Sequence, residues 1–449
     1  MRLHGTMEIN EKGHLVIGGC DTVDLVEEFG TPLYVMDEEL IRQNCRSYYE
    51  AFTATYSNTK VLYASKAFLP MAMCHVIESE GLGLDVVSSG ELYTALKAGF
   101  PVEQIYFHGN NKTQDELILA MESKIGRFVS DNIQEMESLN MLCAAHRMKA
   151  NILIRITPGI EAHTHEYIQT GQIDSKFGLV MSNGQAMEGI RKALQLPNIN
   201  LIGLHCHIGS QIFELESYQH AAEVMMDFLQ KVYEETGHRL AELNLGGGFG
   251  IYYVSGDKPA TIKAYATIVM ETIKRKSEEL DYPLPRILVE PGRSIVGPAG
   301  TTLYTVGSAK DIPGVRKYVA VDGGMTDNPR PALYQARYEA VLANKADMPK
   351  MEEVSIAGKC CESGDMLIWD LHVPLVEQGD VLAVSCTGAY NFSMSSNYNR
   401  IAKPAVVFVR DGQADIVVTR ETLDDIIRND IMPERMKKNK PLSIVGSKK

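Results

Sequence analysis

The chain has 449 residues, 45% of them apolar and 22% charged, which is the composition of a soluble globular protein with room for two domains. Its 44 basic and 57 acidic side chains give a net charge of −13, and this argues against the basic surface that a nucleic-acid-binding protein needs. No apolar run approaches the roughly 18 residues that cross a bilayer. The eight cysteines form no CxxC pair. We therefore expect a cytoplasmic protein with reduced thiols and no membrane partner.

The N-terminal segment MEINEKGHLVIGG (7–19) predicts a short β hairpin that packs with the C-terminal domain. From about residue 60 to 292, eight short apolar or β-branched runs alternate with amphipathic stretches. In chain order the runs are VLYAS (61–65), LGLDVVS (82–88), QIYFHG (104–109), GRFVS (126–130), NILIRI (151–156), IGLHCHIG (202–209), ELNLGG (242–247) and RILVEPG (286–292).

The stretches between these runs have helical patterns. From Ala221 to Val232 apolar residues recur at i, i+3, i+4 and i+7, and Gly237 ends the helix. Ser88 and Thr113 each precede a glutamate by three residues, which is the pattern of a capping box. Eight βα units in about 230 residues predict a closed (β/α)8 barrel, with an open, doubly wound parallel sheet as the alternative.

After Ile295 the runs are strands without long helices between them, and Asp411-Gly412 marks a hairpin turn. This pattern predicts a second, all-β domain. We expect the barrel to cover residues 35–292 and the all-β domain to comprise 1–34 and 293–428. The remainder, 429–449, is basic and weakly patterned and predicts a solvated tail.

Polar residues gather at the predicted C-terminal ends of the barrel strands, where the active sites of such barrels lie. They are Lys66, Asp85, His108, Arg155, His207, Ser210, Gly246 to Gly248, Glu290 and Arg293. Most lysines are solvated surface charges, but one at a barrel mouth can be desolvated and attack a carbonyl. Lys66 is therefore a candidate for a Schiff base with pyridoxal phosphate.

Such a cofactor needs a phosphate site and an acid beside its ring nitrogen. The glycines of LGGGFG (245–250) can bring backbone amides close to an anion, although a tight turn explains them equally well. Ser210 and Arg293 would add donors to the phosphate or to a substrate carboxylate. Glu290, at the end of the last barrel strand, is the candidate acid, with a surface acid as the alternative.

Two further motifs have several explanations. His205 and His207 of GLHCHIGSQ lie on one side of a strand, but two ligands are too few for zinc, so a hydrogen-bonded pair or an imidazole facing a flat cofactor is expected. Cys360 and Cys361 are adjacent, which suits neither a disulfide nor a structural zinc site. No metal site is predicted.

The chain resembles the diaminopimelate decarboxylase family, pyridoxal-phosphate enzymes that share their fold with alanine racemase and eukaryotic ornithine decarboxylase. The matching stretches are FGTPLYVMDE (29–38), YASKAF (63–68), GLDVVSSGEL (83–92), HEYIQTGQIDSKFG (165–178), GLHCHIGSQ (203–211), LNLGGGFG (243–250), EPGR (290–293), NPRPALY (328–334), GKCCESGD (358–365) and TGAYNFSMSSNYN (387–399). They span nearly the whole chain, and together they are highly specific.

The resemblance implies a role for each matching position. Lys66 would form the Schiff base, His207 would stack on the ring and Glu290 would pair with the pyridine nitrogen, with Asp85 and Arg155 in support. The phosphate would be held by Ser210, Gly246, Gly247, Gly248, Gly292 with the EPGR backbone of Arg293, and Tyr390. Substrate would meet Arg293, Arg330, Tyr334, Glu362 and Tyr390. Cys361 would return a proton after carbon dioxide leaves.

The family also implies a homodimer in which the CCES segment crosses into the partner's barrel. Cys360 is then expected to pack, because adjacent strand residues point to opposite faces, and a thiol such as Cys361 is mostly protonated near neutral pH, as a donor should be. meso-Diaminopimelate has an ammonium and a carboxylate at its far end, which Glu362 with Arg330 or Arg293 would match.

The predicted activity is decarboxylation of meso-diaminopimelate to L-lysine. Three alternatives remain open from the residues. They are a related decarboxylase for ornithine, arginine or carboxynorspermidine, a metal-dependent barrel hydrolase using His205, His207 and a barrel acid, and a non-catalytic pyridoxal-phosphate carrier. Such carriers lack a second, all-β domain and a CCES segment.

Overall fold

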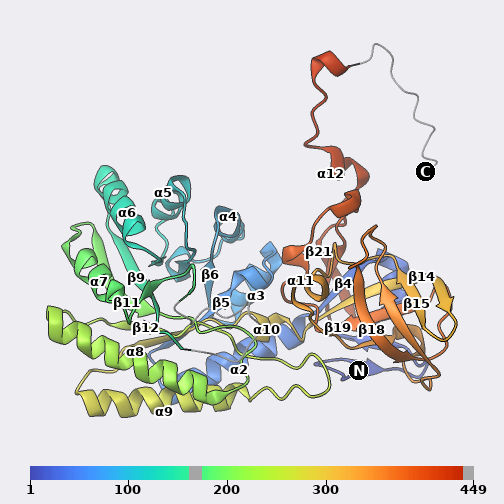
Figure 1. Cartoon of the computed structure of the whole chain (residues 1–449), viewed down its shortest axis with the longest axis horizontal. Coiled ribbons are helices and arrows are strands. Elements are labelled where there is room, and N and C mark those ends of the chain that lie inside the picture. The colour runs from blue at the N-terminus through green and yellow to red at the C-terminus, as the bar shows by residue number, and fades with distance from the viewer. Residues whose placement is uncertain (161–173, 438–449) are drawn as a thin grey trace.

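The computed structural model describes residues 1–160 and 174–437. Residues 165–173 of the HEYIQTGQIDSKFG motif and 438–449 of the predicted tail lie outside the described residues. Figure 1 shows a helix-covered barrel on one side and a β-rich domain on the other, with the C-terminal segment leading away from both. No described helix is both long and apolar enough to cross a membrane.

The barrel closes as predicted. Its strands are β5 (Thr59–Ala64), β6 (Gly83–Val86), β7 (Ile105–Phe107), β8 (Arg127–Ser130), β9 (Ala150–Thr157), β11 (Ile199–His205), β12 (Glu242–Asn244) and β13 (Arg286–Val289). All neighbours pair in parallel, and the ring is completed because β13 pairs with β5 and β8 pairs with β9. This closure excludes the open doubly wound sheet. One short extra strand, β10 (Leu179–Val180), pairs with the end of β9.

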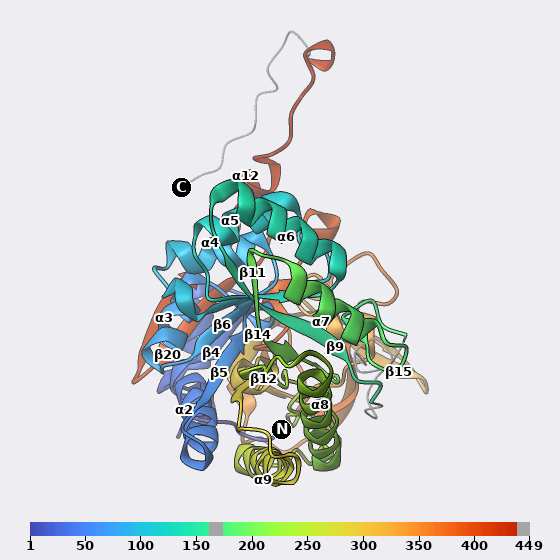
Figure 2. The ribbon, with the colours of Figure 1, turned by 90° about the vertical axis from the view of Figure 1, so that its left-hand side faces the viewer.

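Helices surround the barrel strands, as Figure 2 shows from the barrel end of the molecule. They are α2 (Glu38–Thr55), α3 (Met71–Ser79), α4 (Ser89–Lys97), α5 (Gln114–Glu122), α6 (Ile133–His146), α7 (Gln185–Gln195), α8 (Leu215–Thr236) and α9 (Ile262–Leu280). The predicted helix before Gly237 is α8, and that glycine ends it in a left-handed conformation. Thr113 opens α5 with a complete capping box. Ser88 caps α4, but the Glu91 carboxylate accepts from Val87 N–H, not from the backbone of Ser88.

The second domain is built on β14 (Gly300–Ile312), which pairs antiparallel with β15 (Arg316–Val321), β19 (Val381–Ser385) and β4 (Leu33–Asp37). Outward from β15 lie β17 (Glu352–Ala357) and β18 (Met366–Val373), and β16 (Ala340–Leu342) pairs with β19. On the other side β20 (Ala405–Arg410) runs parallel to β4 and is followed by β21 (Gln413–Val418). The predicted hairpin turn at Asp411-Gly412 is confirmed, with φ positive at both residues.

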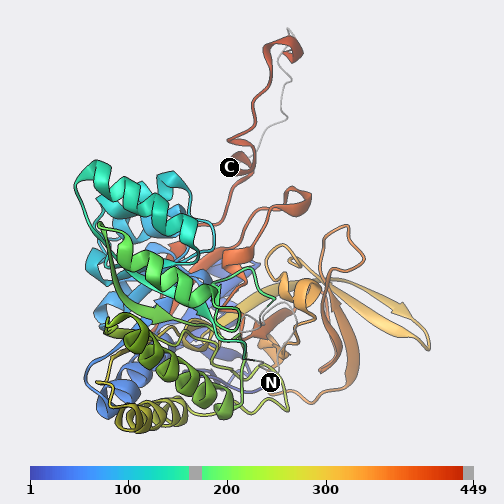
Figure 3. The ribbon, with the colours of Figure 1, turned by 60° about the vertical axis from the view of Figure 1, so that its left-hand side comes forward.

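The N-terminal segment forms a three-stranded sheet of β1 (Glu8–Ile9), β2 (Leu15–Ile17) and β3 (Cys20–Asp21), followed by α1 (Thr22–Phe29). Leu15 and Ile17 pack in one core with Leu33, Leu303 and Val407 of the β domain, which is the packing predicted for this segment. Because β4 belongs to the second sheet and α2 to the barrel, the chain passes between the domains at about Asp37. Figure 3 shows the two domains side by side.

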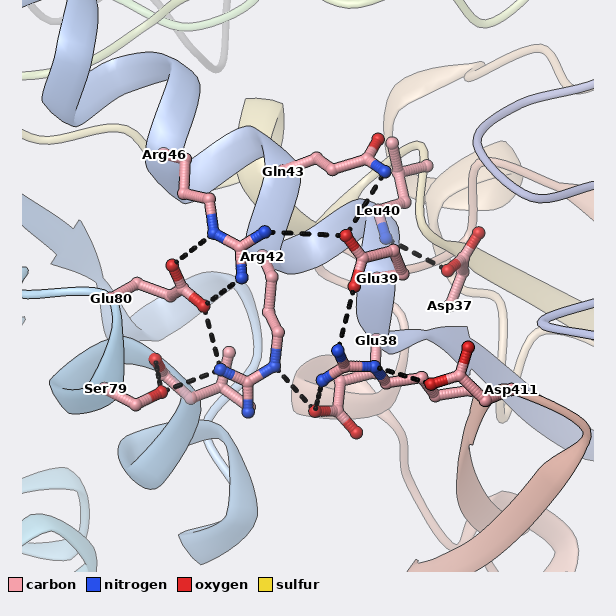
Figure 4. Close-up of polar contacts among 12 residues, drawn as sticks. Asp37, Glu38, Glu39, Leu40, Arg42, Gln43, Arg46, Ser79, Glu80 and Asp411 are labelled. Atoms are coloured by element: carbon pink, nitrogen blue, oxygen red, sulfur yellow. Dashed lines mark hydrogen bonds and ion pairs between the residues drawn. The ribbon is translucent and has the colours of Figure 1, made fainter.

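An ion-pair network ties helix α2 to both domains (Figure 4). Arg42 and Arg46 of α2 both bind Glu80, just beyond α3, at 2.9 and 2.8 Å. At the start of the same helix, Glu38 and Glu39 lie 3.5 and 3.4 Å from Arg410 at the end of β20. The network therefore links the C-terminal end of α3 and the first turns of α2 to the end of β20 in the β domain.

Candidate active site

A cavity of about 800 Å³ lies at the C-terminal mouth of the barrel, where residues 330–337 and 390–394 of the β domain cover it. Its walls bring together most of the predicted site residues from distant parts of the chain. They are Lys66, Asp85, Arg155, His207, Ser210, Gly247, Gly248, Glu290, Gly292, Arg293, Arg330, Tyr334 and Tyr390. Gly246 lies behind this wall, and neither Cys361 nor Glu362 lines the cavity.

Lys66 projects into the cavity from a single 3-10 turn, Ser65–Ala67, that directly follows β5. Ser65 and Ala67 beside it are buried, so the turn itself is held in the core. Enclosure by protein acts to lower the pKa of Lys66, but Tyr390, Asp85 and Glu290 outweigh it and hold this pKa above its usual value. The amine therefore lies near the acidic side chains of Asp85 and Glu290, which form the floor of the cavity.

Glu290 is the centre of that floor. It follows β13, is only 5% exposed, and receives three side-chain contacts. Asn244 Nδ2 donates to Oε1 at 2.6 Å, His108 Nε2 lies 3.0 Å from the same oxygen, and His205 Nε2 lies 3.2 Å from Oε2. Burial acts to raise the pKa of Glu290, but the two imidazoles overcome it and hold that pKa well below its usual range. Glu290 is thus a buried anion at the base of the cavity.

His207 is held as a neutral ring. Its Nδ1 accepts a hydrogen bond from the Gly247 N–H at 3.2 Å, which leaves the proton on Nε2. Burial lowers the pKa of His207 well below its usual value, and the charge of Lys66 adds to this effect. A neutral flat ring against the cavity is suited to face a flat cofactor.

The three glycines after β12 are required by close backbone contacts. A Cβ on Gly247 would lie 2.1 Å from the Glu290 carbonyl oxygen, and one on Gly248, where φ is +99°, would lie 2.4 Å from the carbonyl of Gly209. Two of the three amides donate within the chain, since Gly246 N–H bonds to Asn244 Oδ1 and Gly247 N–H to His207. Beside this loop, Arg293 donates to Ser210 Oγ at 3.0 Å, which places a cation and a hydroxyl together at the cavity wall.

Two buried arginines lie on the substrate side of the cavity. Arg293 opens α10 (Arg293–Val296) and Arg330 opens α11 (Arg330–Tyr334), and they are 7% and 8% exposed. Arg293 donates to Tyr253 OH at 2.7 Å and Arg330 to Tyr338 OH at 2.6 Å. In the described part of the chain neither guanidinium pairs with a carboxylate. A buried cation whose protein partners are only hydroxyls is costly by itself, so the pair is suited to bind an anion.

Tyr390 reaches the same region from the β domain with a strained backbone. Its φ is +62°, a value that non-glycine residues rarely adopt. Its N–H donates to the Ala67 carbonyl at 3.0 Å, one residue beyond Lys66, and the Arg293 guanidinium lies 4.8 Å from its ring. Such strain is often found at functional positions.

The CCES segment lies in a turn between β17 and β18, away from the cavity of its own chain. Cys360 is buried, which agrees with the predicted packing role, and Cys361 is exposed. The reason given by strand alternation is wrong, however, because neither residue lies in a strand. Burial first, and Asp365 second, raise the pKa of Cys360 to about 11.

Part of the site was not assigned from the sequence. His108 was recognised at a strand end but received no role, and Asn244, Tyr253 and Tyr338 were missed. Asn244 lies two residues before the glycine triplet at the end of β12, which is the signal that could have found it. Tyr253 and Tyr338 lie in irregular segments and become neighbours only when the domains meet, so no spacing reveals them.

One group of described residues could hold a metal. His108, His205 and Glu290 place their ligand atoms within 4.8 Å of one another. The hydrolase alternative used His205 with His207, but His207 turns to the glycine loop instead. Asn244 also donates to Glu290, so this carboxylate accepts side-chain hydrogen bonds from Asn244 and His205 and keeps lone pairs for a further donor.

The cavity fits pyridoxal 5′-phosphate. It combines an amine at Lys66, a buried anion at Glu290 for a ring nitrogen, and the Ser210 and Arg293 pair for a phosphate. Asp85 Oδ1 is buried without a hydrogen-bond partner at the same place, and the glycine contacts leave no room for side chains along the wall.

Comparison with known proteins agrees with this geometry. The family profile "Pyridoxal-dependent decarboxylase, pyridoxal binding domain" matches residues 38–297. The chain is 54% identical over 431 residues to diaminopimelate decarboxylase of Bacillus subtilis (strain 168), covering 96% of this chain and 98% of that protein. It is 46% identical to that of Staphylococcus aureus (strain COL), covering 95% and 99%. The structure of diaminopimelate decarboxylase from M. jannaschii in complex with L-lysine superposes with a TM-score of 0.91 at 38% identity, covering 97% and 99% of the chains.

Proposed function

Because the chain belongs to the diaminopimelate decarboxylases, a family of pyridoxal-dependent decarboxylases, we propose that the cavity between its two domains is the active site and that the residues above divide the chemistry among them. The enzyme is a pyridoxal-phosphate-dependent carboxy-lyase that converts meso-diaminopimelate to L-lysine and carbon dioxide, the last step of lysine biosynthesis. The observation that carries the residue assignment is that Arg293 and Arg330, neither of which pairs with a carboxylate in the described residues, line the same cavity as Lys66.

The cofactor, when bound, supplies an electron-withdrawing ring that stores the electron pair left by the departing carboxylate. Lys66 would hold the cofactor through its side-chain amine. Glu290 would hold the ring nitrogen and His207 would face the ring, while Ser210 and Arg293 would hold the phosphate together with the glycine loop, Gly292 and Tyr390. Asp85 and Arg155 complete the floor, where burial and the nearby charges keep their side chains in place.

Substrate recognition depends on the far end of the molecule. Arg330 comes from the β domain and is free of carboxylate partners in the described residues, so it is suited to bind the carboxylate that is retained in the product. Tyr334 and Tyr390 line the same wall. Glu362 would bind the distal ammonium, and Arg330 would bind the distal carboxylate. Ornithine and arginine lack this second carboxylate, so a pocket with both an acid and a cation distinguishes meso-diaminopimelate from them.

Cys361 is exposed and does not line the cavity of its own chain. If it is the proton donor, it must therefore enter the cavity of another subunit. We propose a cytoplasmic homodimer in which the CCES turn of each subunit enters the partner's cavity, where Cys361 donates the proton to the substrate carbon. The exposure of Cys361 and Glu362 beside a buried Cys360 supports this arrangement.

Carbon dioxide release from meso-diaminopimelate, ornithine and arginine, measured side by side, tests the substrate assignment. We expect release from meso-diaminopimelate to exceed the others by far, since only it offers an anion to Arg330. Equal rates on all three would overturn the role of the arginine pair, and a carrier without turnover would release none.

A further inference from the structure

Two histidines of the cavity floor have no role in the chemistry described so far. His205 is the last residue of β11, and His108 follows β7 directly, where its N–H donates to the Val86 carbonyl at 2.7 Å. Their rings meet edge to face with centroids 4.9 Å apart. Both side chains are about 5% exposed or less, and both point their Nε2 atoms at Glu290.

The two contacts divide the carboxylate between them. His108 Nε2 lies 3.0 Å from Oε1 without completing a hydrogen bond, His205 Nε2 is hydrogen-bonded to Oε2 at 3.2 Å, and Asn244 donates to Oε1. His205 Nδ1 is buried without a hydrogen-bond partner, so the ring proton belongs on Nε2, where it can be donated to Glu290. Burial lowers the pKa of His205 to about 4, which leaves the ring neutral near pH 7 and able to donate without adding a charge.

The surroundings show why such donors matter. Glu290 is buried in a floor that also contains Asp85, whose Oδ1 lies 3.7 Å from His108 Nε2. Both carboxylates thus lie within 3.7 Å of the same imidazole nitrogen. When two buried carboxylates lie near each other, their repulsion normally favours protonation of one of them. Burial raises the pKa of Asp85, whereas for Glu290 the effect of burial is overcome by His108 and His205, and its pKa is depressed.

We propose that His108 and His205 are positioning residues that keep Glu290 ionised, so that the proton shared between this carboxylate and the ring nitrogen of the cofactor stays on the nitrogen. The inference rests on the proposed function of Glu290. A proton on the nitrogen makes the ring a stronger electron sink, and a proton on the carboxyl group would leave it neutral and weaker. The His108–His205–Glu290 group thus keeps the proton on the ring nitrogen and is not a metal site.

The test uses holoenzyme loaded with pyridoxal phosphate that is labelled with 15N in the ring. In the wild type we expect the 15N resonance of a protonated pyridine. In His205→Phe, which removes a donor, we expect a shift toward the neutral ring and a fall in kcat of roughly tenfold or more, the effect of losing one hydrogen bond to a buried charge, with little change in KM. His205→Gln keeps an N–H near Oε2 and should restore both signals in part.

His220, which is exposed on α8, provides the matched control, and His220→Phe should leave the spectrum and the kinetics unchanged. If His205→Phe does not retain the cofactor, His108→Phe is assessed in the same way. A neutral ring in the wild type, or an unchanged resonance in a loaded His205→Phe protein, would overturn the inference, as would a stoichiometric divalent metal in the holoenzyme. Wild-type protein with a protonated ring but no release of carbon dioxide would refute the proposed function and leave this inference standing.

Discussion

Arg330→Ala offers the most direct test of how the substrate is recognised. The guanidinium is 8% exposed, donates to Tyr338 OH and lies 4.9 Å from the centroid of the Tyr253 ring, so its planar fork is held rigidly in the cavity wall. Removing one partner of a buried charge pair costs about 3–5 kcal/mol, because the other charge is left without compensation. With about 1.4 kcal/mol for each factor of ten, kcat/KM should fall roughly 10²- to 10³-fold or more.

The product gives this prediction a second, independent measurement. L-lysine keeps the distal ammonium and carboxylate of meso-diaminopimelate, so an arginine that binds the distal carboxylate must also bind lysine. We expect the inhibition constant of lysine to rise by about the same factor as KM in Arg330→Ala, and by less in Arg330→Lys, where a point charge replaces the fork. Arg316→Ala, on β15 away from the cavity, should change neither constant. If KM rises while the inhibition constant of lysine is unchanged, Arg330 does not bind the carboxylate that lysine retains from meso-diaminopimelate.

Four further outcomes are expected. Lys66→Ala should lose turnover and the long-wavelength absorbance of the bound cofactor, and retention of both would refute its role. Cys361→Ala and Lys66→Ala are each expected to be inactive, and mixing them should restore activity through heterodimers with one intact site; no recovery after subunit exchange would contradict a shared site. Burial raises the pKa of Glu91 from 4.5 to about 7, so the stability that protonated Glu91 contributes is present below pH 4.5 and is lost as the pH rises through 7. Glu91→Gln cannot titrate at this position. Its free energy of unfolding in urea should therefore fall less than that of the wild type between pH 5 and 8, by up to about 3 kcal/mol. Dialysis against a chelator should not change carbon dioxide release, and a loss of release that zinc restores would show that the reaction needs a metal.

The barrel was predictable because its signals are local. Each strand is a short apolar run, and each helix shows a helical period of apolar residues. The polar residue at the end of each strand indicates the position of the cavity, and this signal does not depend on the helix that follows. Lys66 and Glu290 were found in this way, at opposite ends of the barrel sequence. Their meeting depends only on the pairing of β13 with β5, which closure of the ring dictates.

Contacts that depend on the meeting of two domains were not predictable in the same way. Arg330 was identified by resemblance, but its tyrosine partners lie in segments without a periodic pattern. Glu91 was interpreted as half of a capping box, and its pattern is that of one. The carboxylate nevertheless turns to Val87 N–H at 2.6 Å and becomes a buried acid near Asp85. A capping-box pattern of four residues predicts where a helix begins, but it does not determine which of two nearby backbone amides donates to the glutamate side chain.

The adjacent cysteines show how one turn can give two identical side chains different surroundings. Asp365 accepts hydrogen bonds from Met325 N–H at 2.6 Å and from Cys360 N–H at 2.8 Å, and a Cβ on Gly358 would lie 2.2 Å from its Oδ2. The carboxylate therefore fills the inside of the turn and draws Cys360 inward. The next residue has no place inside, so Cys361 faces outward, where its N–H bonds to Asn399 Oδ1 at 2.8 Å. The same turn therefore buries Cys360 and leaves the Cys361 thiol exposed, which is the position that the proposed shared site requires.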